Sequence, residues 1–505
     1  MVNAKKYARF FTSDQLAPDL KNKSVRAGVY VLASTGGLHV LQLCSVVLLA
    51  RVLLPEHFGL VSMVTVLTGF ADRVKHLGLS TATIQQKDIT HEQVSALFWI
   101  NAGGGLLISA VLAGLSWWIA EFYQEPSLIA VTLTLSLSFV FGGLSVQHEA
   151  LLRRQMKFKV LAYVQIGANL LSILLGIMLA LNGFTYWALV WKELTKSIFD
   201  AMGKWLACRW WPSFVGLSSG IGHLLHVGKN IFSVDSIYTA SRMMDQLLLG
   251  KFAGAEALGL YKQAFQLMAA PMSQLTYPVG SVALPSLSIL QGEPDRYQGY
   301  YQKILSLLSF VTIPMATFVA IFSEDIIAIV LGEQWMGSAW ILRVLSIGAM
   351  IEPLISTCGM VMITQKKTAR LLKWTLVYGL CLILGFAMGV QWGAIGVALG
   401  YTISHYVLMI PALTFGFRET PISLSVFFRV VSVPAGLSLI MGTILLFLAR
   451  EIVFLDSVSR LGLSLIVAVV SYLGLWLILP RGRERLFGDI SSLLAAFRPS
   501  PRSCN

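Results

Sequence analysis

Three charged side chains lie within one apolar stretch of the chain, at a spacing that places them on one face of a helix. They are Asp235, Arg242 and Asp245, in the run that ends at Lys251. At about 100° per residue, Arg242 falls about 20° from Asp235, and Asp245 about 60° further round. Three charges facing lipid would cost on the order of 8 kcal/mol, at roughly 2.5 to 3.5 kcal/mol each. We therefore expect this face to look into a protein interior.

Lysines in a neighbouring apolar stretch indicate what such an interior could bind. Lys192 and Lys196 are one helical turn apart, and Glu193 is the nearby acid. Because unneutralised positive charge inside a helix bundle favours an anionic occupant, a phosphate-bearing molecule is the expected ligand. The side chains that we expect to bind it are Arg242, Lys192, Lys196, Lys262 and Arg73. Arg73 has a second interpretation, because it could snorkel from a helix end into the headgroup layer.

Carboxylates in the same stretches could couple transport to an ion. Asp235 has no opposite charge one turn away, so it is the first candidate for binding a proton or a sodium ion. Asp245 and Glu352 are the other candidates. An alternative is that ion pairs such as Arg242 with Asp245 only hold the helices in register.

Motifs of the common enzymatic sites are missing from the sequence. No glycine-rich loop ends in Lys-Ser or Lys-Thr, and no His/Cys cluster has the spacing of metal ligands. His39, His148 and His405 are scattered, so we expect hydrogen-bonded structural histidines. We therefore expect no catalytic residue, no metal and no cofactor, and a protein that is not an enzyme.

Composition identifies the elements that must position these charges. Only 12% of the 505 residues are charged, and the mean hydropathy is +0.72, which indicates a polytopic membrane protein. The net charge of +13 could suggest nucleic acid, but the cations cluster in alternate connections, as membrane topology requires. We expect Lys204 and Arg209 to lie in one such connection. This pattern predicts that both ends are cytoplasmic and that the number of spans is even.

A span needs about 20 apolar residues, and this rule predicts about fourteen helices. They are expected to begin near residues 28, 58, 96, 127, 159, 184, 229, 256, 301, 339, 369, 393, 425 and 461. The predicted layout is a cytoplasmic tail (1–27), spans 1–6 as an N-lobe (28–208), a cytoplasmic linker (209–228), spans 7–12 as a C-lobe (229–417), spans 13 and 14 (418–480), and a cytoplasmic interfacial tail (481–505).

A short block occurs twice in the chain and indicates an internal duplication. Leu48-Leu49-Ala50-Arg51 with Glu56 and Gly59 is matched 200 residues later by Leu248-Leu249-Gly250-Lys251 with Glu256 and Gly259. A second echo, Gly183 and Gly393, has an offset of 210. The two blocks lie at the ends of spans 1 and 7. Because these spans are six apart, an even number, the two copies have the same orientation in the membrane. This predicts two parallel six-helix lobes.

Several motifs resemble those of bacterial polysaccharide flippases. They are Phe58-Gly59-Leu60, Gly69-Phe70, Leu77-Gly78-Leu79-Ser80, Leu97-Phe98-Trp99, Leu151-Leu152-Arg153-Arg154, Asn230, Asp245, Leu258-Gly259-Leu260-Tyr261 and Leu284-Pro285-Ser286-Leu287-Ser288. The resemblance, over residues 24 to 420, is to the Wzx-type branch of the multidrug/oligosaccharidyl-lipid/polysaccharide (MOP) exporter superfamily, in particular exporters of the colanic-acid and teichuronic-acid type. It implies an all-α fold of two six-helix bundles plus two helices.

The resemblance also implies a function. Members of this family flip undecaprenyl-pyrophosphate-linked oligosaccharide to the periplasmic leaflet of the bacterial inner membrane by alternating access, for exopolysaccharide and lipopolysaccharide assembly. Asn230 and Asp245 match the family motif, which adds Asn230 to the expected binding residues. The expected partners are this substrate, membrane lipids and polysaccharide polymerase or chain-length components, without nucleic acid. An ion-coupled multidrug exporter and a non-transporting scaffold of a polysaccharide complex remain alternatives.

Overall fold

The computed structural model describes residues 20–75, 83–84, 89–214 and 221–479, with side chains in these ranges except those of 20–29, 31–33, 70, 72–75, 221–240 and 242. All the regular structure in these ranges is helical, without a β-strand. The predicted all-α fold class is therefore confirmed. Helices lie at each of the fourteen expected places, with α9 covering two of them.

Internal contacts divide the chain into two compact units. Unit 1 comprises residues 1–243 and 254–256, and unit 2 comprises residues 244–253 and 257–505. Unit 1 holds α2 (Leu20–Ala50), α3 (Pro55–Lys75), α5 (His91–Tyr123), α6 (Ser127–Arg154), α7 (Phe158–Leu181) and α8 (Trp187–Cys208). Unit 2 holds α10 (Pro294–Ile321), α11 (Ser323–Val330), α12 (Gly337–Ala349), α13 (Glu352–Thr364), α14 (Thr368–Gly389), α15 (Gly393–Phe417), α16 (Leu424–Glu451) and α17 (Ser457–Ile478). Helix α9 (Ile221–Ile289) contributes to both units.

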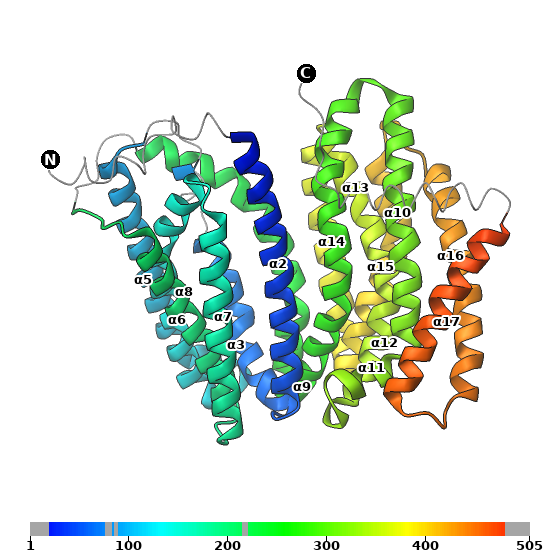
Figure 1. Ribbon diagram of the computed structural model, residues 1–505, viewed down its shortest axis with the longest axis horizontal. Helices are drawn as coiled ribbons and strands as arrows, with labels where there is room; N and C mark the ends of the chain where they lie inside the picture. Colours follow the sequence, from blue (N-terminus) through cyan, green and yellow to red (C-terminus); the bar gives the residue numbers. More distant parts are fainter. Residues whose placement is uncertain (1–19, 76–82, 85–88, 215–220, 480–505) are drawn as a thin grey trace. The chain divides into compact units, whose positions relative to one another are not determined.

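Long helices make up most of both units (Figure 1). In the described residues, eight stretches are long and apolar enough to cross a membrane. They are His91–Tyr123, Ser127–Arg154, Phe158–Leu181, Pro294–Ile321, Gly337–Thr364, Thr368–Phe417, Leu424–Glu451 and Ser457–Ile478. The stretch Thr368–Phe417 contains two helices, α14 and α15, joined by the 3-10 turn η5 (Val390–Trp392). The chain is thus a multi-pass membrane protein, and the count of fourteen spans stays a prediction.

The two units repeat the same pairing of helices. In unit 1, α5 packs on α6, α6 on α8, and α7 on α8. In unit 2, α10 packs on α12 and α13. Both α12 and α13 pack on α15, and α14 also packs on α15. The patterns coincide when α5, α6, α7 and α8 are matched with α10, α12–α13, α14 and α15. This repeated packing supports the internal duplication.

Turns at matching positions have the same backbone conformation. Residues 155–157 join α6 to α7 and residues 365–367 join α13 to α14, 210 positions later. In both turns the middle residue is left-handed, with φ of 57° and 58°. The backbone amide of Lys157 donates to the Leu152 carbonyl at 3.0 Å, and that of Lys367 donates to the Met362 carbonyl at 2.8 Å. Each bond reaches five residues back, as in a Schellman motif. Gly183 and Gly393, also 210 apart, both have a positive φ, of 82° and 66°.

A break inside α9 occupies the position that corresponds to the α2–α3 connection. Gly254 has φ 84° and ψ −179°, a conformation that is essentially restricted to glycine. At the offset of 200, Gly254 corresponds to Leu54, which directly precedes the first residue of α3. Corresponding residues of the two halves are 210 positions apart after α12, because the connection from α10 to α12 contains the additional helix α11.

Glycines allow the helices of a hairpin to approach closely. A Cβ on Gly396 of α15 would lie 1.9 Å from the carbonyl oxygen of Gly389 in α14, so neither position has room for a side chain. In unit 1, a Cβ on Gly105 of α5 would lie 2.5 Å from the carbonyl oxygen of Phe139 in α6. Such backbone contact is typical of membrane helices, where packing rather than the hydrophobic effect drives association.

The C-terminal hairpin α16–α17 is packed into unit 2. Helix α16 lies against α10 and α17 against α11. Arg460 of α17 donates through Nε to Oδ1 of Asp325 in α11 at 2.9 Å, and a second guanidinium nitrogen also contacts this oxygen. Asp325 is buried, so this ion pair lies within the packed contact between α11 and α17.

Candidate anion-binding site

A polar stripe runs along helix α8 of unit 1. Lys192, Glu193, Lys196, Ser197, Asp200 and Lys204 fall within about 140° of one another at 100° per residue. Most of the buried residues of α8 lie outside this sector, among them Ala188, Val190, Leu194 and Ala201, whereas the buried Leu189 lies within it. The helix therefore carries its charges on one side, and this side includes the buried Lys204.

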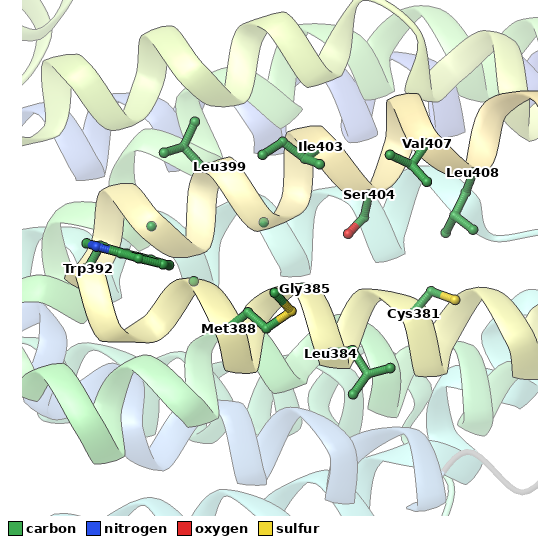
Figure 2. A pocket seen from close by; sticks show the side chains of 13 residues that line it. Cys381, Leu384, Gly385, Met388, Trp392, Leu399, Ile403, Ser404, Val407 and Leu408 are labelled. Carbon is green, nitrogen blue, oxygen red and sulfur yellow. The ribbon is translucent and has the colours of Figure 1, made fainter.

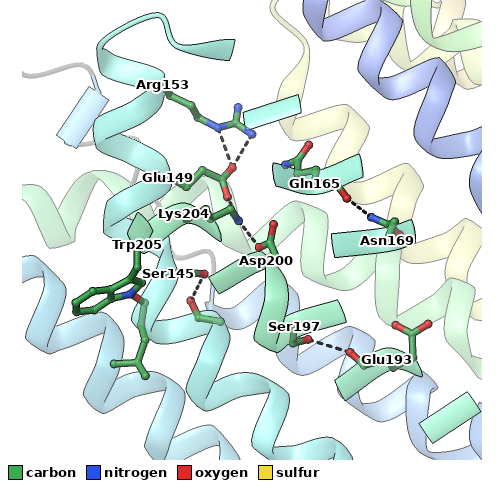
Figure 3. Close-up of polar contacts among 12 residues, drawn as sticks. Ser145, Glu149, Arg153, Gln165, Asn169, Glu193, Ser197, Asp200, Lys204 and Trp205 are labelled. Atoms are coloured by element: carbon green, nitrogen blue, oxygen red, sulfur yellow. Dashed lines mark hydrogen bonds and ion pairs between the residues drawn. The ribbon is translucent and has the colours of Figure 1, made fainter. Parts of the chain in front are cut away.

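One end of this stripe is a closed ion network (Figure 3). The Lys204 ammonium donates to Glu149 of α6 at 2.6 Å and to Asp200 at 2.5 Å. Arg153 donates through Nε to the other oxygen of Glu149 at 2.9 Å. Lys204 is only 5% exposed. Two cations and two carboxylates thus neutralise one another and join α6 to α8.

Lys192 has a looser environment at the other end of the stripe. Its ammonium lies 3.5 Å from the Glu193 carboxylate and 3.4 Å from the Ser45 hydroxyl of α2. Its aliphatic part lies over Gly176 of α7, where a Cβ would come within 3.2 Å of it. Both polar contacts are longer than a charge-assisted hydrogen bond of about 2.8 Å. The phosphate oxygens of a ligand could therefore replace them.

Lys196 lies between these two groups and is half-buried. Among the described residues, no carboxylate lies within ion-pair distance of its ammonium. Glu193 contacts Lys192, and Asp200 contacts Lys204. Within the described part of this stripe, Lys196 is therefore the cation whose charge is not offset by a carboxylate. An anion beside it would restore neutrality.

In unit 2, Asp245 is held by a hydrogen-bond partner on the same helix, α9. The Tyr261 hydroxyl donates to Oδ2 at 2.9 Å, and the Gln246 amide donates to Oδ1 at 2.6 Å. Asp245 is 3% exposed and Tyr261 is fully buried. This buried carboxylate is consistent with the expected ion-coupling role, which stays a prediction.

Other expected residues of unit 2 lie at separate positions. Lys262 follows Tyr261 in α9, and Glu352 is the first residue of α13; both are half-buried and both have interaction partners. A further charged residue of unit 2, Arg343 of α12, donates to Glu324 at 2.9 Å and lies over the ring of Trp340. Arg343 is thus engaged with the start of α11.

Four expected residues lie outside the described side chains. The backbones of Asn230, Asp235 and Arg242 belong to α9 and that of Arg73 to α3. Their roles stay predictions. The structure consequently brings together Lys192, Glu193 and Lys196 of the expected set, all on α8.

The network around Lys204 was not anticipated from the sequence. The sequence predicts Lys204 in a connection after the sixth span, but the residue lies within α8 and is buried. The spacing of Asp200 and Lys204, one turn apart, was an available signal. Glu149 could not be added without knowing that α6 packs on α8. In the sequence, Tyr261 is recognisable only as part of the motif Leu258-Gly259-Leu260-Tyr261, without a sign that it contacts Asp245.

Histidines in the described residues make structural hydrogen bonds. His148 Nε2 contacts the carbonyl of Trp210 at 3.1 Å, which fixes the segment after α8. His405 Nε2 contacts the Tyr378 hydroxyl at 2.8 Å. In the described residues no group of His, Cys, Asp and Glu side chains could hold a metal ion.

An apolar groove lies between α14 and α15 (Figure 2). It has a volume of about 410 Å³ and no charged lining residue. Its walls include Leu384, Met388, Trp392, Ile403 and Val407, all exposed. The groove therefore suits hydrocarbon and cannot neutralise an anion.

Known structures share this fold. The lipid II flippase MurJ, in an inward closed conformation, matches with a TM-score of 0.72 at 15% identity over 92% of this chain and 100% of that chain. An inward-facing multidrug resistance MATE family transporter of the MOP superfamily matches with a TM-score of 0.59 at 13% identity over 75% and 93%. The chain therefore has the fold of the MOP superfamily.

Sequence comparison defines the family. The model of the family described as polysaccharide biosynthesis protein matches residues 48–340, which is more than half of the chain, so the chain belongs to that family. It is 26% identical to the teichuronic acid biosynthesis protein TuaB of Bacillus subtilis, over 90% of this chain and 95% of TuaB. It is 22% identical to the lipopolysaccharide biosynthesis protein WzxC of Escherichia coli, over 80% and 85%.

Proposed function

We propose that this protein is a flippase for oligosaccharides linked to undecaprenyl pyrophosphate, and that Lys196 with Lys192 binds the anionic head group. The relatives support the substrate class, because TuaB is named for teichuronic acid biosynthesis and WzxC for lipopolysaccharide biosynthesis. A further relative, ExoT of Rhizobium meliloti, is named a succinoglycan biosynthesis transport protein. One observation supports the placement of the binding site: among the described residues, no carboxylate lies within ion-pair distance of the Lys196 ammonium.

The physical reason is the cost of an unbalanced charge in a membrane helix. A lysine near the bilayer centre costs roughly 2.5 to 3.5 kcal/mol on insertion scales. This cost persists unless an anion or water compensates the lysine. A pyrophosphate group carries the opposite charge and could contact both ammonium groups at once.

The proposal extends to coupling, partners and location. Asp235, Asp245 and Glu352 are the proposed ion-coupling carboxylates, and Arg242, Asn230, Lys262 and Arg73 are the further proposed binding residues. We place the protein in the bacterial inner membrane, with both termini in the cytoplasm, where the bias of cations in alternate connections would put them. A polysaccharide polymerase or chain-length component would use the exported unit.

Leaflet exchange in liposomes tests this function. The purified protein is reconstituted with a fluorescent lipid-pyrophosphate oligosaccharide, and loss of accessibility to a membrane-impermeant quencher is followed. We expect exchange with the wild type and at least a tenfold slower rate for Lys196→Met. Lys373→Met is the matched control, because Lys373 is an exposed lysine of α14, and its exchange rate should be unchanged.

The same assay separates the alternatives. Exchange of cationic drugs but not of the lipid-linked donor would support a multidrug exporter. A scaffold would exchange neither. An unchanged rate for Lys196→Met would contradict the assignment of Lys196 to the head group even if exchange occurs.

A further inference from the structure

We propose that Lys204 is a positioning residue that keeps Asp200 away from Lys196 and so preserves the positive charge of the binding site. This inference rests on the proposed anion site on α8 and names the group that maintains it. Lys204 itself would not contact the substrate, because it is 5% exposed and both of its acceptors are carboxylates.

Asp200 has a lysine one helical turn away on either side. Lys196 precedes it by four residues and Lys204 follows it by four. Residues four apart on a helix are neighbours, so either ammonium could pair with the carboxylate. In the structure, Asp200 contacts Lys204 at 2.5 Å.

Glu149 explains why Lys204 is the preferred partner. Helix α6 places this second carboxylate 2.6 Å from the Lys204 ammonium, and Arg153 binds the other oxygen of Glu149. The buried ammonium is thereby satisfied by two acceptors, which a single ion pair of Lys196 with Asp200 could not equal. The α6–α8 contact thus determines which lysine Asp200 binds.

Loss of Lys204 would redistribute the charges. Asp200 would lose its partner, and Lys196 would be the nearest cation on the same helix face. Glu149 would keep Arg153. The Lys196 charge would then be neutralised within the protein, and the site would lose its attraction for an anion.

Two double variants test this mechanism. We expect Lys204→Met to weaken binding of inorganic pyrophosphate to the full-length protein in nanodiscs at least tenfold, by isothermal titration calorimetry. Adding Asp200→Asn should restore binding to within about threefold of wild type, because no carboxylate remains to capture Lys196. Adding Glu149→Gln instead should not restore it, because Asp200 is still free. Both double variants remove Lys204 and one carboxylate, so they are matched.

A second readout does not depend on the ligand. Acetylation of Lys196 by an amine-reactive reagent, quantified by mass spectrometry, should slow several-fold in Lys204→Met. It should recover only when Asp200→Asn is added. Size-exclusion profiles confirm that each variant is folded.

The outcomes separate this inference from the proposed function. Equal impairment of both double variants, in binding and in acetylation, would show a packing role for Lys204 and overturn the inference. If pyrophosphate binds no variant and not the wild type, the proposed anion site fails. The acetylation pattern would then still decide whether Lys204 keeps Asp200 from Lys196.

Discussion

The Tyr261 hydroxyl donates a hydrogen bond to the buried Asp245 carboxylate at 2.9 Å, across the break in α9 at Gly254. The two residues are 16 positions apart in sequence. A straight helix would separate them by about 24 Å, at 1.5 Å per residue. The break therefore turns the chain after Gly254 back toward Asp245 within unit 2, and it brings a tyrosine to a carboxylate that is a candidate for ion coupling.

Tyr261→Phe should weaken this arrangement without removing the ring. A hydrogen bond to a charged group is worth about 1.5 to 3 kcal/mol, so we expect a lower midpoint of thermal unfolding and a slower leaflet exchange. The Gln246 amide would still bind the carboxylate. Tyr300→Phe is the control, because Tyr300 is a partly buried residue packed against the core of unit 2 and no partner of its hydroxyl is described. Equal midpoints for the two variants would mean that the Asp245 contact does not contribute to stability.

Arg460→Met should destabilise unit 2 by leaving the buried Asp325 carboxylate without its guanidinium partner. Breaking a buried pair typically costs about 3 to 5 kcal/mol, and the partial exposure of Arg460 places this case at the lower end. Denaturant or thermal unfolding in detergent would measure the loss. The double variant with Asp325→Leu should recover most of it, since no charge is then left unpaired. No recovery would indicate that Arg460 acts through packing.

Glu419, in the connection between α15 and α16, predicts a pH dependence. Hydrogen bonds from Arg370 and then Lys367 hold the pKa of the Glu419 carboxyl below its usual value of 4.5. A lowered pKa in the folded state gives a contribution to stability that is complete above the unfolded pKa. That contribution is lost as the pH falls through the folded pKa.

Wild type and Glu419→Gln should therefore differ in the midpoint of thermal unfolding near neutral pH, and this difference should shrink below about pH 4.5. Because the carboxyl group is fully exposed, the difference should also fall with added salt. A difference that is constant from pH 7 to pH 3 would contradict the assignment of this ion pair.

Much of the fold could be predicted from the sequence because its determinants are local. Apolar stretches of about 20 residues identify the membrane helices, since each span satisfies its own backbone hydrogen bonds. The recurrence of Gly183 as Gly393, and of the block near Arg51 as that near Lys251, indicated the duplication. The structure supports it through matching turns and matching helix pairs.

The sequence by itself determined that charges occur on one face of α8, because angular position on a helix depends only on spacing. Only the tertiary structure decided which of these charges are neutralised. Lys204 and Lys196 are equally distant from Asp200 along the chain, and the contact of α6 with α8 brings Glu149 to Lys204 alone. Ion pairing between helices depends on packing, which no spacing within one helix encodes.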